Sequence, residues 1–159
     1  MCGPLKRGKI SETNLTLVCY SYILDASNPV GVAFKGDNGK YLSRIRRGSI
    51  DFIEVAKPHM DHFTRFLATE SNGKLLLQAD NGKYLSRIRR GSIDFIEAEK
   101  DAPDVFCHFT VNNQPDGTVV LQADNGKYMS RIRRGTIDFY EAYKSEIDVF
   151  CKLRFEFQL

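Results

Sequence analysis

Short apolar runs ended by turn residues recur along the chain, and no segment sustains a helical period. In the last third, residues 119–123 form a short, mainly apolar run. Asp124-Asn125-Gly126 is a strong tight-turn signal, and residues 127–130 are expected to form the return strand. Residues 137–140 and 150–157 alternate apolar and polar side chains, as strands do. We expect the Arg-Arg-Gly sequence at 133–135 to be an exposed loop. The pattern predicts four short strands.

This four-strand pattern occurs three times. The block DNGKYLSRIRRGSIDFIE occupies residues 37–54 and recurs unchanged at 80–97. A third copy at 124–141 differs only at Met129, Thr136 and Tyr140, and the offsets between copies are 43 and 44 residues. The similarity extends to both sides of each block, so three units are expected at 32–74, 75–118 and 119–159. Residues 1–31 stand outside the repeat as an N-terminal extension.

Three four-stranded units restrict the architecture. Propellers use about four blades or more, and a solenoid would need polar capping repeats that this sequence lacks. Closure around a pseudo-threefold axis leaves no long open strand edge. We therefore predict an all-β fold, a β-trefoil formed by residues 32–159. In the extension, residues 15–24 could add a strand that packs under the barrel or pairs with a second subunit, which would give a homodimer through residues 1–31.

The short motif in each block carries a family resemblance. Gly-Lys-Tyr-Leu-Ser at 39–43 and 82–86 follows a short apolar strand, and Phe66-Leu67-Ala68 precedes Asn72-Gly73-Lys74 and a leucine run in the same phase. In these features residues 32–159 resemble the fascin and hisactophilin group of β-trefoils, which implies actin binding. A looser similarity links the unit to mussel-type galactose-binding trefoil lectins, although Ser43-Arg44 stands where those sites carry His-Pro.

Composition and charge narrow the function classes. The 159 residues are 42% hydrophobic and 27% charged, which is typical of a globular protein, and no apolar run is long enough to span a bilayer. The net charge is only +3, too small for a dedicated nucleic-acid-binding domain. Each block contributes +1, and the rest of the chain is balanced. Without an apolar leader after the first basic residues we expect a cytoplasmic protein, with secretion by another route left open.

The blocks are nearly identical although the segments between them have diverged, and an exposed Arg-Arg-Gly is rarely needed three times for folding alone. We therefore interpret each block as a ligand site. The alternative is a self-contained network in which the arginines pair with Asp51 and Glu54 and bind nothing. The candidate ligand-binding residues are Asp37, Asn38, Lys40, Tyr41, Arg44, Arg46, Arg47 and Asp51, with their copies Asp80, Asn81, Lys83, Tyr84, Arg87, Arg89, Arg90, Asp94, Asp124, Asn125, Lys127, Tyr128, Arg131, Arg133, Arg134 and Asp138.

These residues predict a non-enzymatic, multivalent, lectin-like protein with three equivalent sites for glycans or other anionic or polar ligands. Two alternatives stay open: an actin-binding or bundling protein, and a defence or toxin protein that recognises surface glycans. Catalysis has little support, because His59, His62 and His108 lie in the diverged segments and no nucleophile or phosphate-loop motif occurs. No metal site and no cofactor are predicted.

Overall fold

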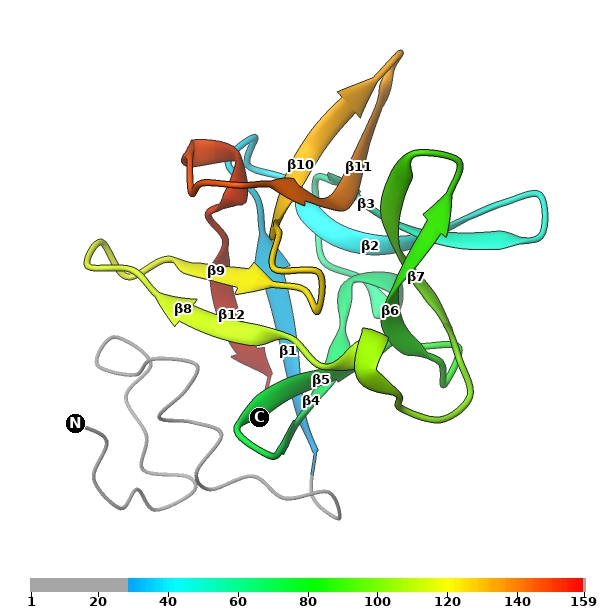
Figure 1. Ribbon diagram of the computed structural model, residues 1–159, viewed down its shortest axis with the longest axis horizontal. Coiled ribbons are helices and arrows are strands. Elements are labelled where there is room, and N and C mark those ends of the chain that lie inside the picture. The colour runs from blue at the N-terminus through cyan, green and yellow to red at the C-terminus, as the bar shows by residue number, and fades with distance from the viewer. Residues whose placement is uncertain (1–28, 159) are drawn as a thin grey trace.

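The computed structural model describes residues 29–158 and contains twelve β-strands and three short 3₁₀ helices (Figure 1). The strands are β1 (Val30–Lys35), β2 (Tyr41–Arg47), β3 (Ile50–Lys57), β4 (Phe66–Ser71), β5 (Lys74–Gln78), β6 (Tyr84–Arg90), β7 (Ile93–Lys100), β8 (Thr110–Asn113), β9 (Val119–Gln122), β10 (Tyr128–Arg134), β11 (Ile137–Lys144) and β12 (Arg154–Gln158). The 3₁₀ helices are η2 (His62–Thr64), η3 (Val105–Cys107) and η4 (Val149–Cys151). None of the helices in this part of the chain could span a membrane.

Six of the strands close into a barrel. β1 pairs with β12 and β4, β4 with β5, and β8 with β9, all antiparallel. Backbone bridges Leu75–Phe109 and Val119–Leu153 complete the ring. Closure gives the backbone N–H and C=O groups at the strand edges hydrogen-bond partners. The interior of the barrel holds the main apolar core. The fold is the predicted β-trefoil.

The other six strands form three long hairpins, β2–β3, β6–β7 and β10–β11, which cap one end of the barrel and extend in different directions (Figure 1). They meet at the pseudo-threefold axis, where the rings of Phe52, Phe95 and Phe139 lie edge to face with all centroids 5.1 Å apart. This second apolar cluster is separate from the barrel core. Edge-to-face contacts suit three symmetric rings because each positive edge meets a negative face.

The hairpin tips differ from the sequence prediction. The Arg-Arg pair was expected in a loop, but Arg46 and Arg47 are the last residues of β2, and only Gly48 and Ser49 form the turn. Gly48 has φ +63°, the left-handed value that a two-residue hairpin turn requires at its first position. Because β2 continues to Arg47, Arg46 lies opposite Asp51 of β3 and Arg47 lies opposite Ile50. A second correction concerns Phe150 and Cys151, which lie in η4 and not in a strand.

The first repeat begins slightly earlier than the sequence boundary. β1 starts at Val30, and Val30 pairs with Ala68 of β4, so the barrel includes residues assigned to the extension. The strand predicted at 15–24 and the dimer proposed through residues 1–31 concern residues that lie mostly outside the described range, and both stay predictions.

Candidate functional site

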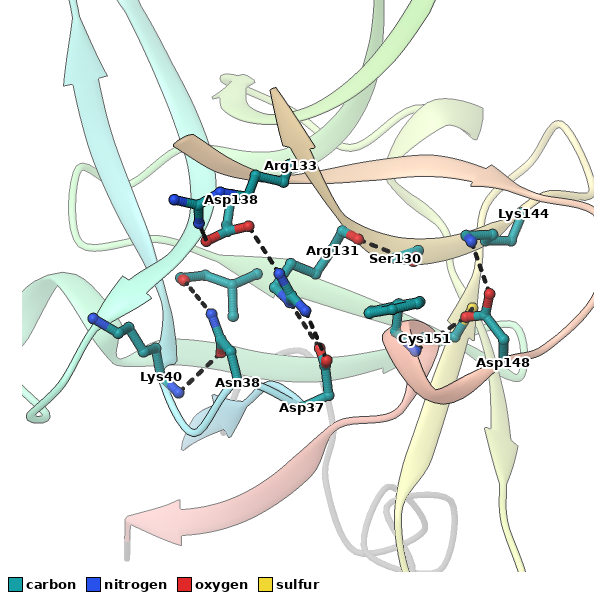
Figure 2. Close-up of polar contacts among 12 residues, drawn as sticks. Asp37, Asn38, Lys40, Ser130, Arg131, Arg133, Asp138, Lys144, Asp148 and Cys151 are labelled. Atoms are coloured by element: carbon teal, nitrogen blue, oxygen red, sulfur yellow. Dashed lines mark hydrogen bonds and ion pairs between the residues drawn. The ribbon is translucent and has the colours of Figure 1, made fainter. Parts of the chain in front are cut away.

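One arginine of each block bridges two neighbouring units. Arg131 on β10 donates through Nε and Nη2 to Asp37 at 2.9 and 2.8 Å, and through Nη1 to Asp138 at 2.9 Å (Figure 2). Asp37 belongs to the first unit and Arg131 to the third, so this contact joins the two ends of the repeat series. The equivalent bridges at the other two boundaries are Arg44–Asp80 and Arg87–Asp124. We call Arg44, Arg87 and Arg131 the inter-unit arginines.

These bridges are strong because they are bidentate and largely shielded from water. The inter-unit arginine side chains are only 14–16% exposed. The hydrogen bond to Asp80 raises the pKa of Arg44 further above its ordinary value, and the same contact lowers the pKa of Asp80. Both members of the Arg44–Asp80 bridge are therefore stabilised in their charged forms. The three arginine–aspartate bridges therefore hold neighbouring units together.

A second set of arginines lies further out on the hairpins. Arg46 donates through Nη1 to Asp51 at 2.7 Å, on the carboxylate oxygen that Arg44 leaves free. We call Arg46, Arg89 and Arg133 the rim arginines. Their side chains are 57–59% exposed, and the hydrogen bonds within residues 29–158 use only Nη1 of each guanidinium. The other N–H groups of these guanidinium forks are available to a ligand.

The third set, Arg47, Arg90 and Arg134, has a structural role. Arg47 donates through Nε and Nη2 to Glu54 at 2.6 and 2.9 Å. Glu54 is only 2% exposed and lies in β3, which pairs with both β7 and β11. A carboxylate buried in this way needs a cationic partner, and Arg47 supplies it. The hydrogen bond to Glu54 raises the pKa of Arg47. We call these three the tip arginines.

The asparagine of each block stabilises its turn through side-chain hydrogen bonds to the backbone. Asn38 accepts a hydrogen bond from the Lys40 backbone N–H through Oδ1 at 3.0 Å and donates through Nδ2 to the Val55 carbonyl at 3.1 Å. Asn81 makes the same two contacts, and Asn125 makes the first. This geometry mimics a backbone turn, so the amide of Asn38 is occupied without a ligand.

The lysines and tyrosines of the blocks differ among units. Lys83 pairs with Asp101, and Lys127 donates to Ser145 at 2.9 Å. In the described range no carboxylate pairs with the Lys40 ammonium, which is exposed. The Tyr41 ring lies 5.4 Å from the Lys35 ammonium in a cation–π contact. Lys40 is therefore the most accessible block lysine.

A groove of about 370 Å³ lies between the first and third units. The first unit contributes Asn38, Lys40, Arg47 and Glu54, and the third contributes Arg131, Arg133, Thr136, Ile137 and Asp138. The groove therefore combines Lys40 of the first block with the rim arginine of the third block. At the other two boundaries the same arginine bridges form, and because the blocks repeat we expect corresponding grooves there.

An aromatic ring lies beside each inter-unit arginine and was not predicted from the sequence. The Phe150 ring of η4 lies 5.2 Å from the Arg131 guanidinium and 5.2 Å from the Lys144 ammonium. Asp148 caps η4 and accepts a hydrogen bond from Lys144 at 2.7 Å, as Figure 2 shows. A Lys-x-x-x-Asp-x-Phe spacing recurs at 57–63, 100–106 and 144–150, and this repetition could have revealed the contact.

The thiols and acidic groups indicate no further chemistry in the described residues. Cys107 and Cys151 are buried, and burial raises the pKa of both thiols, which disfavours the reactive thiolate. Between residues 29 and 158 no three His, Cys, Asp or Glu side chains are grouped to hold a metal ion. Cys2 and Cys19 lie outside the described range.

The arrangement defines a class of protein, a β-trefoil whose units are linked by arginine bridges. The designed threefold-symmetric protein ThreeFoil has a TM-score of 0.68 at 14% identity, with 79% of this chain and 96% of that chain covered. A mosquitocidal holotoxin has a TM-score of 0.65 at 9% identity, covering 80% of this chain and 16% of that one. Lysenin in complex with phosphocholine has a TM-score of 0.63 at 12% identity, covering 80% and 44%. These similarities establish the fold.

A similar sequence identifies the family of this chain. No protein-family model matches the chain. Peptide Hact-3 from Heliofungia actiniformis is 71% identical over 34 residues, which are 21% of this chain and 97% of the peptide. The chain belongs to the family of Peptide Hact-3. The matched stretch is shorter than one of the three repeat units.

Proposed function

We propose that the protein is a non-enzymatic, multivalent binding protein whose three inter-unit grooves bind glycans or other polar, anionic ligands. The observation that carries this proposal is the threefold repetition of a rim arginine that the fold uses only in part. Each rim guanidinium is oriented by one aspartate and keeps its remaining N–H groups in solvent. Sugar hydroxyls, carboxylates and sulfates all offer acceptors for such a donor fork.

The groove supports the same proposal through its shape and charge. A volume of about 370 Å³ lies within the range of small-ligand sites. Lys40, Arg47, Arg131 and Arg133 line or border it, and their charges exceed by one those of the carboxylates that pair with them. Thr136 and Ile137 add a hydroxyl and an apolar face, which suit a sugar ring. Three such grooves would make binding multivalent, so avidity would exceed the affinity of one groove.

The direct test is a triple substitution of the rim arginines, R46Q/R89Q/R133Q, on a glycan array. We expect binding to be lost. The free energy of unfolding should change by only about 1 kcal/mol per pair, because each rim arginine is more than half exposed and its aspartate keeps the hydrogen bond from the inter-unit arginine. The matched control is K57Q/K100Q/K144Q, which removes the same number of charges outside the grooves. Retained binding by the arginine variant, or no binding of the native chain to any neutral or anionic glycan, would contradict the proposal.

The two alternatives make different predictions. Actin binding rests on the resemblance to fascin and hisactophilin, and co-sedimentation with filaments at low and high salt tests it. A glycan-recognising defence or toxin role uses the same grooves, and similar solved structures include a mosquitocidal holotoxin and Cry35Ab1. Target-cell binding that R46Q/R89Q/R133Q abolishes would support that role. Pelleting with filaments in the absence of any glycan binding would favour actin.

A further inference from the structure

The three units differ where β1 meets β12, side by side in the centre of Figure 1. In this antiparallel pair Lys35 lies directly opposite Arg154. The corresponding pairs are Leu67 opposite Gln78 in β4–β5 and Thr110 opposite Gln122 in β8–β9. We call the β1–β12 junction the seam. It carries two opposed cations where the other units carry neutral pairs.

Opposed like charges in a sheet are destabilising, so this pair needs an explanation. In the other units the glutamine ties the following turn, since Gln78 Nε2 donates to the Gly82 carbonyl at 2.8 Å and Gln122 repeats this contact. The Lys35 ammonium makes a cation–π contact with the Tyr41 ring, and between residues 29 and 158 neither Lys35 nor Arg154 forms an ion pair with a carboxylate. The repulsion between the two side chains is therefore not relieved by the described part of the fold.

Both side chains line a groove of about 420 Å³ at the seam, together with Asp37, Asp116 and Lys152. The two carboxylates already have cationic partners. Asp37 is held by Arg131, and Asp116 accepts hydrogen bonds from Thr118 and, at 3.0 Å, from Lys152. The unbalanced charge of the groove is therefore that of Lys35 and Arg154.

We propose that the seam groove is an oxyanion site that binds a sulfate or phosphate ester group of a soluble ligand between Lys35 and Arg154. A dianion between two opposed cations would remove their repulsion and gain two charge-assisted contacts. The groove is large enough for the group and part of the molecule that carries it. The corresponding pairs at the other two strand junctions are neutral, and the seam cations are not among those that line the groove between the first and third units.

The test compares the native chain with K35Q/R154T, which gives the seam the residue types of the β8–β9 pair. Inorganic sulfate is titrated at constant ionic strength while amide NMR shifts of Gly36, Gly39 and Lys152 are followed. We expect saturable shifts in the native chain and at least tenfold weaker binding in K35Q/R154T. K74Q, which removes a lysine from a different hairpin, is the charge control and should bind like the native chain.

Further arms identify the source of the group and separate this site from the grooves. A phosphate monoester and a sulfated disaccharide should compete with sulfate, and R46Q/R89Q/R133Q should still bind it. At low salt without sulfate, K35Q/R154T should also unfold at higher denaturant than the native chain. Absence of saturable shifts, equal binding by K35Q/R154T, or binding only to phosphatidic acid vesicles would overturn the proposal.

Discussion

Replacing Tyr140 by phenylalanine should stabilise the protein. Tyr140 is 1% exposed in the barrel core, and its hydroxyl has no hydrogen-bond partner among the described residues. The corresponding residues of the other units are Ile53 and Ile96, which have no polar atom to satisfy. The third unit therefore buries one hydroxyl that its neighbours avoid.

The size of the effect follows from two opposing contributions. A buried hydroxyl without a partner costs about 1–3 kcal/mol. Removing its oxygen leaves a void of roughly 10 Å³, which costs only about 0.2 kcal/mol at ~24 cal/mol per Å³. We therefore expect Tyr140→Phe to raise the free energy of unfolding by about 1 kcal/mol or more, and the melting temperature by about 4 °C per kcal/mol.

Equilibrium denaturant unfolding measures this change, provided that the m-value stays constant. The matched control is Tyr128→Phe, because Tyr128 lies at a strand start and is partly exposed. That control should change stability by no more than about 0.5 kcal/mol. If Tyr140→Phe instead destabilises the chain by more than this, the hydroxyl has a partner such as an internal water molecule, and the reasoning is wrong.

The pH dependence gives a second readout of the same group. Burial raises the pKa of Tyr140 well above its ordinary value of 10.0. Above pH 10 the unfolded chain loses the phenolic proton while the folded chain keeps it. The Tyr140 hydroxyl therefore makes the free energy of unfolding fall as the pH rises above 10. Phenylalanine has no proton to lose. The stability advantage of Tyr140→Phe should therefore be constant at neutral pH and grow above pH 10, and a constant advantage throughout would show that the hydroxyl is not buried.

Three further predictions concern the hairpins and loops. Arg134→Ala leaves buried Glu141 without its bidentate partner and should lower the free energy of unfolding by about 2 kcal/mol, measured with denaturant. The cost is smaller than for a fully buried pair because Arg134 is partly exposed. A decrease below about 0.5 kcal/mol would contradict this. Hydrogen bonding by Lys100 lowers the pKa of Asp104, so its contribution is present above the ordinary value of 3.8 and lost at lower pH. Asp104→Asn should flatten this acid limb of the stability curve, and an unchanged limb would refute the assignment. Gly48→Ala forces a side chain into φ +63° and should lower the melting temperature, at a cost of about 1 kcal/mol.

The fold could be predicted because the repeat and the strand pattern agree at every level. Asp-Asn-Gly turns, apolar runs and the threefold period all favour a closed β-trefoil, and the twelve strands follow this plan. The errors were local. Arg46 and Arg47 were predicted in a loop because charged residues beside glycine resemble turns, but pairing with Asp51 and Glu54 keeps them in the strand. Propensity cannot anticipate such cross-strand pairing.

The site was harder to predict because its parts come from different units. The block contains charged residues that line the groove, yet sequence order alone cannot show that Arg131 crosses to Asp37, 94 residues away. The seam was missed for a related reason. Lys35 and Arg154 become neighbours only when the barrel closes, and neither departs from its local strand pattern.

The contacts also explain why the blocks have stayed alike, and for which residues. An inter-unit arginine must match an aspartate in the next block, and a tip arginine must match a buried glutamate, so changes at either position are penalised by partners. The rim arginines share this constraint only in part, because Asp51 keeps a hydrogen bond from Arg44 when Arg46 is absent and the Arg46 side chain is 57% exposed. Among the block arginines, the rim arginines are therefore the ones whose threefold retention the described fold explains least. Their retention favours a ligand at the grooves over a purely structural network.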